Sequence, residues 1–540
     1  MDSSEQTLNR AQLLVRAGSL GAAVTLGIPA LARAGASALG YDAATDTLTW
    51  MLPASIRSLD FVHSYDAGTT VVLGLGLEGL LVYDKAGALQ PRLARSWSHP
   101  DPLTYVYRLR QGVKWWDGKP FTAADVVFSM AQHLDPKVGS QVATFYANVR
   151  SIRATAADTV TIKLKKPDPA FQYIPAAHAG FIVQRAFSKK HGKSIGTPSV
   201  LTMGTGPYRI VKYTPDQGVS LKRNDAYWGP KPPTANVELK FITEESTRLL
   251  AMRTGDVDGT FGVPVEQSNQ WSKIRDARVV FAPELSVDFF SFDMDTAPWS
   301  DIHVRRAVSH AADKAGMVSA LLRGHGEVAT SLVPPQQWGG VLPQPAVRRL
   351  YRELPKYSYS LARARAELSQ SSVPNGFSAS VQYPNSVPLL GKMCLALART
   401  LKQIGINLDV NEVTGDKWFN DIYAHKNLGL QVMQFVPDFP DPINYPTYLL
   451  ASEHAVKNDF NMANYRSATM DALIKRQEKA TRPAVRAQAL GQMLRLAARD
   501  VPYLPIAWPE TAMAISKDFS YGGFNALYFN QPWAAQIRAT

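Results

Sequence analysis

The chain has 540 residues, of which 46% are hydrophobic and 19% are charged, and its formal net charge is +13. This length exceeds the roughly 250–300 residues at which a single hydrophobic core stops growing, so more than one folded body is expected. The basic residues form only short clusters such as Lys163–Lys166, which argues against a nucleic-acid-binding module, and the single cysteine, Cys394, excludes an intramolecular disulfide and a multi-cysteine zinc site.

Residues 1–34 have the pattern of an export signal. Arg10 and Arg16 supply a positive start, a weakly apolar Gly- and Ala-rich stretch follows, and Ala32-Arg33-Ala34 fits a cleavage site. The segment LNRAQLLVRAG is similar to a twin-arginine signal, with Asn9 in place of the first arginine. Both the twin-arginine and the general secretory route therefore stay open, and we expect a periplasmic or otherwise extracytoplasmic protein.

Alternating polar and apolar residues predict strands along the whole chain. The expected strands are an extended start over 41–51, Leu80–Tyr83, Thr104–Leu109, Ser151–Leu164, Arg209–Tyr213, Val219–Lys222, Val237–Ile242, Ser378–Tyr383, Asn407–Val413 and a buried strand at Val501–Trp508. Helical periodicity predicts helices at Val71–Leu81, Val126–His133, Ser246–Arg253, Asp301–Leu322, Leu361–Leu368, Leu389–Ile404, Met470–Lys479 and Arg486–Arg499. A capping box, Thr122 to Asp125, marks the start of the second of these helices. The mixture favours an α/β fold.

The order of the elements predicts two lobes connected by a hinge. The pattern changes around Val279–Asp293, and we place a first crossing between lobes near residue 285 and a second near 505. This gives lobe I at 35–285, lobe II at 286–504 and a return to lobe I at 505–540. Two crossings are what a hinge needs, and hinged lobes that close on a ligand are a common switching geometry.

The motifs of cofactor-dependent enzymes are absent or lack their context. Gly74–Gly79 matches G-x-G-x-x-G, but a hairpin-like segment follows where a dinucleotide site needs a crossover helix, so close packing is the better interpretation. There is no H-E-x-x-H and no G-x-S-x-G, and the histidines are dispersed. We therefore expect no cofactor, no metal site and no enzymatic activity.

Asp438 and Asp441, in a proline-stiffened loop among aromatic residues, are the acids of most interest. One interpretation is a fixed anion for a ligand ammonium, since a charge-assisted hydrogen bond is worth roughly 1.5–3 kcal/mol. Another is turn formation, because aspartate before proline favours turns. A third is an acid–base pair of an exported enzyme, although two acids in one loop diverge easily.

Four blocks of the chain resemble, in the same order, the peptide/nickel family of solute-binding proteins, which feed ATP-driven importers. They are LLVYDKAGALQPRLARSWSHPDPLTYVYRLRQGVKWWDGKPFTAADVVFSM (Leu80–Met130), Met203–Ile242, Trp299–Val318 with Leu332–Gly340, and Phe435–Tyr445 with Asp500–Trp508. The resemblance implies a two-lobed periplasmic-binding-protein fold of the large class, with hinge-connected lobes. It also implies an extra subdomain in lobe I, which we place at about 83–202.

The resemblance implies capture of di- or oligopeptides, or a related small solute, between the lobes. A membrane permease and its ABC ATPase subunits would receive the solute. It assigns the ligand's α-ammonium to Asp441, with Asp438 as its neighbour, and places Phe435 where other members have a pocket tryptophan. Gly68 and Thr69 fall in a segment whose backbone meets the ligand main chain.

One feature leaves the identity of the ligand open. No arginine after Tyr383 matches the one that holds a peptide carboxylate in some members. A carrier for a nickel chelate or haem is therefore an alternative within the same class, although the sparse histidines and single cysteine disfavour direct metal ligation. We expect a monomer.

Overall fold

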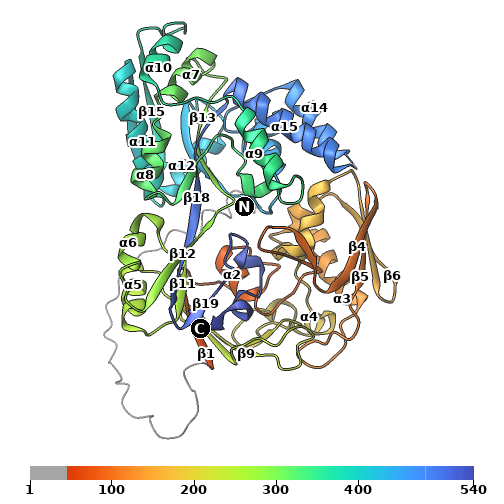
Figure 1. The fold of residues 1–540 in the computed structure, drawn as a ribbon. Helices are drawn as coiled ribbons and strands as arrows, with labels where there is room; N and C mark the ends of the chain where they lie inside the picture. The colour runs from red at the N-terminus through yellow and green to blue at the C-terminus, as the bar shows by residue number, and fades with distance from the viewer. Residues whose placement is uncertain (1–45, 481) are drawn as a thin grey trace, which may run out of the picture.

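A long mixed sheet runs through both lobes of the molecule in the computed structural model, which describes residues 46–480 and 482–540 (Figure 1). Its ten strands include a continuous path in the order β17-β13-β18-β11-β1-β10-β9-β8, with β12 and β14 also paired to β18. The predicted export signal at 1–34 lies outside the described residues. Within those residues, no helix is long and apolar enough to cross a membrane.

Lobe I, the lower body in Figure 1, is built on the β1 end of this sheet. Its elements are β1 (Thr47–Leu52), β8 (Tyr208–Thr214), β9 (Gly218–Arg223), β10 (Asn236–Phe241), β11 (Gly259–Phe261), β12 (Ala277–Pro283), β19 (Phe519–Ser520), β20 (Arg538–Ala539), α2 (Ala67–Leu73), α5 (Glu245–Thr254) and α6 (Ser268–Trp271). Leu48 and Trp50 of β1 are fully buried, as their alternation predicts. Trp50 packs on Phe261 and Trp533 with ring centroids 4.9 and 5.1 Å away, so the chain's C-terminal segment completes this core.

The inserted subdomain, at the right of Figure 1, has a small antiparallel sheet of its own in the order β4-β5-β7-β6. Its elements are β2 (Leu81–Tyr83), β3 (Leu89–Pro91), β4 (Ala94–Asp101), β5 (Thr104–Leu109), β6 (Val149–Ala156), β7 (Thr159–Leu164), α3 (Ala123–Ala131) and α4 (Arg185–His191). The predicted strand Thr104–Leu109 is confirmed, and so is the capping box, in which Thr122 and Asp125 bond each other's backbone. In the predicted segment Ser151–Leu164, the alternating Val160, Ile162 and Leu164 form the expected strand, β7, and the residues before the turn form a further strand, β6, which pairs with it antiparallel.

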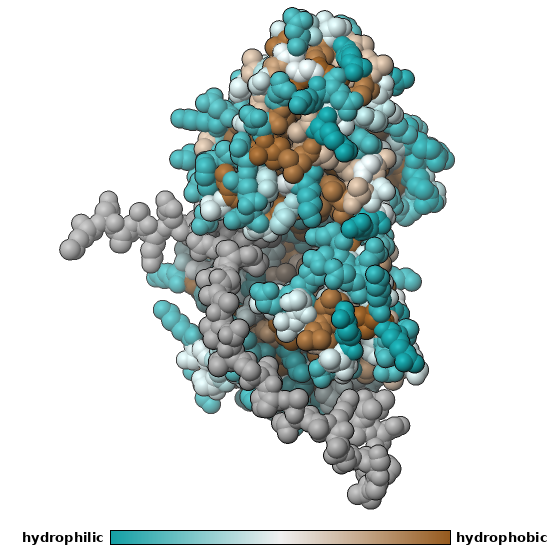
Figure 2. Space-filling view, turned by 90° about the vertical axis from the view of Figure 1, so that its left-hand side faces the viewer, coloured by the Kyte–Doolittle hydropathy of each residue, from teal (hydrophilic) through white to brown (hydrophobic). Residues whose placement is uncertain are grey.

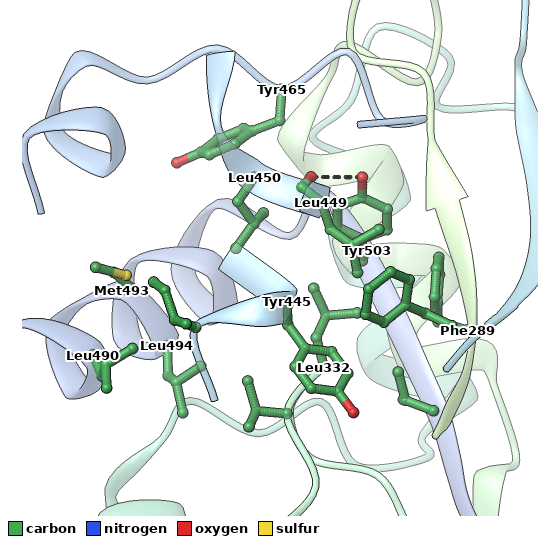
Figure 3. Close-up of a cluster of buried hydrophobic side chains, with 14 of the residues drawn as sticks. Phe289, Leu332, Tyr445, Leu449, Leu450, Tyr465, Leu490, Met493, Leu494 and Tyr503 are labelled. Atoms are coloured by element: carbon green, nitrogen blue, oxygen red, sulfur yellow. Dashed lines mark hydrogen bonds between the residues drawn. The ribbon is translucent and has the colours of Figure 1, made fainter. Parts of the chain in front are cut away.

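Lobe II, the upper body in Figure 1, covers its part of the sheet with helices. Its elements are β13 (Val287–Phe292), β14 (Gly326–Val328), β15 (Phe377–Pro384), β16 (Ile406–Val413), β17 (Leu430–Phe435), α7 (Ile302–Ala311), α8 (Lys314–Leu321), α9 (Gln344–Glu353), α10 (Leu361–Leu368), α11 (Pro388–Leu401), α12 (Gly415–Tyr423), α13 (Asn444–Leu450), α14 (Ala468–Glu478) and α15 (Pro483–Asp500). Figure 3 shows part of its core, where the Tyr503 hydroxyl donates to the Leu449 carbonyl at 2.7 Å.

The strand β18 (Tyr503–Ser516) belongs to both lobes. Its first residues pair with β13, where Phe290 faces Leu504, and its last residues pair with β12, where Ala277 faces Ser516. The chain therefore passes between the lobes once in the segment after β12 and once within β18. Seen from the side, both bodies are mostly hydrophilic, with hydrophobic residues gathered in separate patches (Figure 2).

Two predicted helices differ from the structure because aspartates cap helices at other residues. The predicted helix Val71–Leu81 is instead α2, which begins at Ala67 because Asp66 accepts the Thr69 N–H. The predicted helix Asp301–Leu322 is two helices, and Asp313 caps the second by accepting the Gly316 N–H at 2.9 Å. A local carboxylate that satisfies an orphan helix N–H sets where a helix begins.

Candidate functional site

The loop that follows β17, Phe435–Tyr445, lies where lobe II meets lobe I and the inserted subdomain; we call it the acidic loop. The Tyr65 hydroxyl, from the segment before α2, donates to Asp438 Oδ1 at 3.2 Å. On the other side, Phe439 stacks on Tyr173 of the inserted subdomain, with ring centroids 5.6 Å apart and an interplanar angle of 8°. The acidic loop therefore contacts both neighbouring parts of the molecule.

Asp441 is buried in an ion pair. Its side chain is 0% exposed and its Oδ1 lies 2.6 Å from an amino nitrogen of Arg486, which is 7% exposed. The same oxygen accepts the Ile443 N–H at 3.0 Å, and Arg486 Nε donates to Gln477 at 3.1 Å. Burial by itself lowers the pKa of Arg486, but the Asp441 carboxylate outweighs it and the net pKa is raised. The guanidinium is therefore charged, and the pair is part of the fold of lobe II.

This placement argues against Asp441 as the contact for a ligand ammonium. A solute that took the carboxylate would have to displace Arg486 and leave its guanidinium buried without a partner, which is costly. Asp441 also has a local structural role, because its carboxylate accepts the Ile443 N–H and so holds the turn that leads into α13. The turn interpretation of the sequence thus fits Asp441 better than the ligand interpretation.

Asp438 is the acid of the loop that faces the neighbouring lobe. It is half-buried rather than enclosed, and its Oδ1 accepts a hydrogen bond from the Tyr65 hydroxyl of lobe I. Tyr83 of the inserted subdomain lies close enough to be affected: burial raises its pKa well above the ordinary value, and the charges of Tyr173, Tyr65 and Asp438 add to the rise. The Asp438 carboxylate is therefore near both Tyr65 and Tyr83 at the junction of the lobes.

Phe435 contributes to an aromatic cluster on the lobe II side. It is 7% exposed and packs edge-on against Tyr445, with ring centroids 5.1 Å apart. Tyr448 and Phe460 lie further out, at 6.3 and 6.4 Å. The following residue, Val436, is 48% exposed. Phe435 therefore supports the base of the acidic loop, while the adjoining backbone is accessible.

Gly68 and Thr69 lie in the first turn of α2 rather than in a loop. Thr69 is fully buried, and both its N–H and its hydroxyl are bonded to the Asp66 carboxylate, at 2.8 and 2.7 Å. A Cβ on Gly68 would lie 3.3 Å from Asp66 Oδ1, so the glycine leaves room for the cap. The Thr69 side chain is therefore committed to the helix start, and Ala67 is the exposed residue of this turn.

Three residues of the junction were missed in the sequence: Tyr65, Tyr173 and Arg486. An arginine on the apolar face of a helix is a signal for a buried partner. Arg486 is such a residue, because it lies on the face of α15 that is buried, next to Ala487. The two tyrosines had no such signal, because their contacts to Asp438 and Phe439 join segments hundreds of residues apart. Among the described residues, no cluster of three or more His, Cys, Asp or Glu side chains could hold a metal ion.

Comparison with known proteins gives a consistent result. The family described as bacterial extracellular solute-binding proteins, family 5 Middle, matches residues 88–457. The glutathione-binding protein GsiB of Escherichia coli (strain K12) is 25% identical over 465 residues, which cover 84% of this chain and 88% of GsiB. The structure of HbpA2 from Haemophilus parasuis is similar with a TM-score of 0.80 and 20% identity, covering 92% of this chain and 100% of HbpA2. The periplasmic binding protein DppA from Helicobacter pylori in complex with peptide STSA has a TM-score of 0.72 and 21% identity, covering 91% of this chain and 98% of DppA.

Proposed function

Since the chain belongs to family 5 of the bacterial extracellular solute-binding proteins, we propose that it captures a di- or oligopeptide, or a related small cationic solute, between its two lobes. The observation that carries the proposal is Asp438, a carboxylate of lobe II that meets Tyr65 of lobe I at the junction. A ligand ammonium placed there gains a charge-assisted hydrogen bond from one lobe and contact with the other, and so favours closure.

We propose the following division of roles in the site. Asp438 receives the ammonium, while Asp441 fixes the loop through Arg486. Phe435 anchors the start of the acidic loop by packing on Tyr445. The accessible backbone around Val436 and Ala67 meets the ligand main chain. The first-turn residues Gly68 and Thr69 position Ala67 through the Asp66 cap.

The hinge is proposed to lie in the two connections between lobes. These are the segment between Pro283 of β12 and Val287 of β13, and the middle of β18. We accordingly keep the boundaries 35–285, 286–504 and 505–540, with the subdomain at about 83–202, as proposals. Opening and closing would bend these connections and leave the packing within each lobe unchanged.

The transport context is proposed from the relatives. DppA is described as an ABC transporter-associated periplasmic binding protein. By analogy, this chain would be exported, act in the periplasm as a monomer, and deliver its solute to a permease with ABC ATPase subunits. An exported enzyme is a weaker alternative, because burial of Asp441 against Arg486 removes one member of the acid–base pair.

Glutathione is a specific candidate within the peptide class, because GsiB is described as a glutathione-binding protein. Its free α-ammonium would suit Asp438. The ligand would be identified by a thermal-shift screen of the mature chain from about residue 35 with dipeptides, oligopeptide pools, glutathione and nickel–histidine. A ligand at 100 times its dissociation constant adds about 2.7 kcal/mol of stability, so a true ligand gives a clear shift.

The variant Asp438→Asn tests the assignment of the ammonium. It should weaken binding of the identified peptide roughly ten-fold or more, because it removes the charge that the ammonium needs. Asp409→Asn is the matched control, since Asp409 is an exposed aspartate of the same lobe on β16. Unchanged affinity in Asp438→Asn would contradict the proposed anchor, and the absence of a shift with any peptide would contradict the ligand class.

A further inference from the structure

Lobe II contains a cavity of about 260 Å³ that is separate from the acidic loop's junction with lobe I. It lies between α7, α8, the segment after β14, the segment before α10, the ends of α13 and α15, and the start of β18. Its wall is mainly apolar and includes Ala312, Leu332, Leu450, Leu494, Ala497 and Tyr503. Figure 3 shows several of these side chains, among them Leu332, Leu450, Leu494 and Tyr503.

Of the three charged residues that line the cavity, Asp313, Lys314 and Lys356, the lysine at 314 has no acidic partner. Its ammonium donates to the Ala329 carbonyl at 3.2 Å, and no carboxylate among residues 46–480 and 482–540 forms an ion pair with it. The neighbouring Asp313 is used elsewhere, because its Oδ1 caps α8. Burial lowers the pKa of Lys314 to about 8, so it is largely protonated at neutral pH. The cavity therefore holds an incompletely satisfied positive charge against an apolar wall.

The size of the cavity limits the ligand. An apolar cavity of roughly 150 Å³ in another protein holds benzene, and drug-sized ligands occupy roughly 300–1,000 Å³. A volume of about 260 Å³ lies between these and suits a molecule with an apolar body of one ring or a medium chain. Val328 and Tyr359, which also line the cavity, are 37% and 46% exposed, so a ligand can enter from solvent on their side.

We propose that this cavity is a second binding site, for a small monocarboxylate with an aromatic or medium-chain apolar body, whose carboxylate pairs with the Lys314 ammonium. A carboxylate supplies the partner that the buried ammonium lacks, and the apolar body gains from leaving water. A neutral molecule of the same shape would gain only the free energy of removing its apolar body from water. The site does not depend on the ligand bound between the lobes.

Calorimetric titration of the mature protein with phenylacetate and octanoate tests this. Both should bind, while phenylacetamide and phenethylamine, which have the same apolar body without a carboxylate, should bind at least about ten-fold more weakly. This comparison uses the unaltered protein. Equal binding of phenylacetate and phenylacetamide, or no binding of either acid at millimolar concentration, would overturn the proposal.

Three variants locate the site. Lys314→Met removes the charge with little change in length and should weaken phenylacetate binding at least about ten-fold. Ala498→Phe keeps the lysine but fills the cavity and should abolish binding. Lys356→Met is the matched control, because Lys356 lines the same cavity but is exposed, and its loss should change affinity by less than about two-fold. Wild-type affinity in Lys314→Met or Ala498→Phe would place any binding elsewhere and overturn the assignment.

Discussion

Exchanging Asp441 for asparagine separates a structural acid from a ligand-binding acid within one loop. In the folded protein the carboxylate is 0% exposed and 2.6 Å from Arg486. The amide of Asp441→Asn keeps the shape and can still accept the Ile443 N–H, but it leaves the guanidinium with only the neutral side chains of Gln477 and Tyr173 as partners. Removing one partner of a buried ion pair costs roughly 3–5 kcal/mol, and we expect about 3 kcal/mol here because one oxygen remains.

The measurement is urea unfolding followed by tryptophan fluorescence, with Asp438→Asn beside it as the size-matched variant. Asp438→Asn should change the free energy of unfolding by less than about 0.5 kcal/mol, because the side chain is only half-buried and the amide oxygen can still accept the Tyr65 hydroxyl. Arg486→Met alone should also destabilise, since it leaves the Asp441 charge unpaired. The double variant Asp441→Asn/Arg486→Met should then lose less than the sum of the two single losses.

The reasoning is refuted by the opposite pattern. If Asp441→Asn unfolds at the wild-type urea concentration and loses peptide binding at a temperature where it is fully folded, Asp441 is the ligand contact. If the losses of the single variants add in the double variant, the ion pair contributes nothing to stability and the burial argument fails.

Three further outcomes follow from other parts of the structure. Burial and the charge of Glu284 raise the pKa of Asp288 to about 7, so the folded protein keeps a proton there that the unfolded chain loses near pH 4, and its stability falls as the pH rises from about 4 to 7. The variant Asp288→Asn cannot ionise, so its free energy of unfolding in urea should gain roughly 2–3 kcal/mol relative to the wild type between pH 5 and pH 8. Parallel pH profiles of the two proteins would contradict this. Thr122→Ala should cost about 1 kcal/mol by removing half of the capping box with Asp125, with a smaller loss counting against the observed cap geometry. Tyr65→Phe removes the hydroxyl that lobe I offers to Asp438, so peptide affinity measured by calorimetry should change while the unfolding midpoint of lobe II stays the same; an unchanged affinity would place Tyr65 outside the site.

Local signals in the sequence determined many elements of this protein. Thr104–Leu109 and Leu361–Leu368 have the predicted bounds, because alternation and helical periodicity record which face of an element is buried. The capping box at Thr122 is present for the same reason, since both of its partners lie within one turn of the chain. The predicted helix Ser246–Arg253 is confirmed as α5, and Gly255 follows its end with a positive φ of 76°, which suits glycine.

The errors arose where two local patterns compete. The predicted single helix Asp301–Leu322 contains Asp313, which is compatible with a helix interior by periodicity but caps a new helix in the structure. The prediction for Ser151–Leu164 rested on the alternation of Val160, Ile162 and Leu164, whereas β6, before the turn, buries only Val149 and Ile152 and shows no such alternation. Such choices depend on which neighbouring element the segment packs against.

The sequence by itself determined the α/β class, and its ordered blocks identified the family, because both depend on patterns contained in short segments. The different environments of Asp438 and Asp441, by contrast, arise only from tertiary packing. Two aspartates three positions apart look alike in a sequence, yet one faces Tyr65 across the lobe junction and the other is enclosed against Arg486. Their partners lie 373 and 45 residues away along the chain, and the burial that sets the cost of each charge exists only after the lobes have packed.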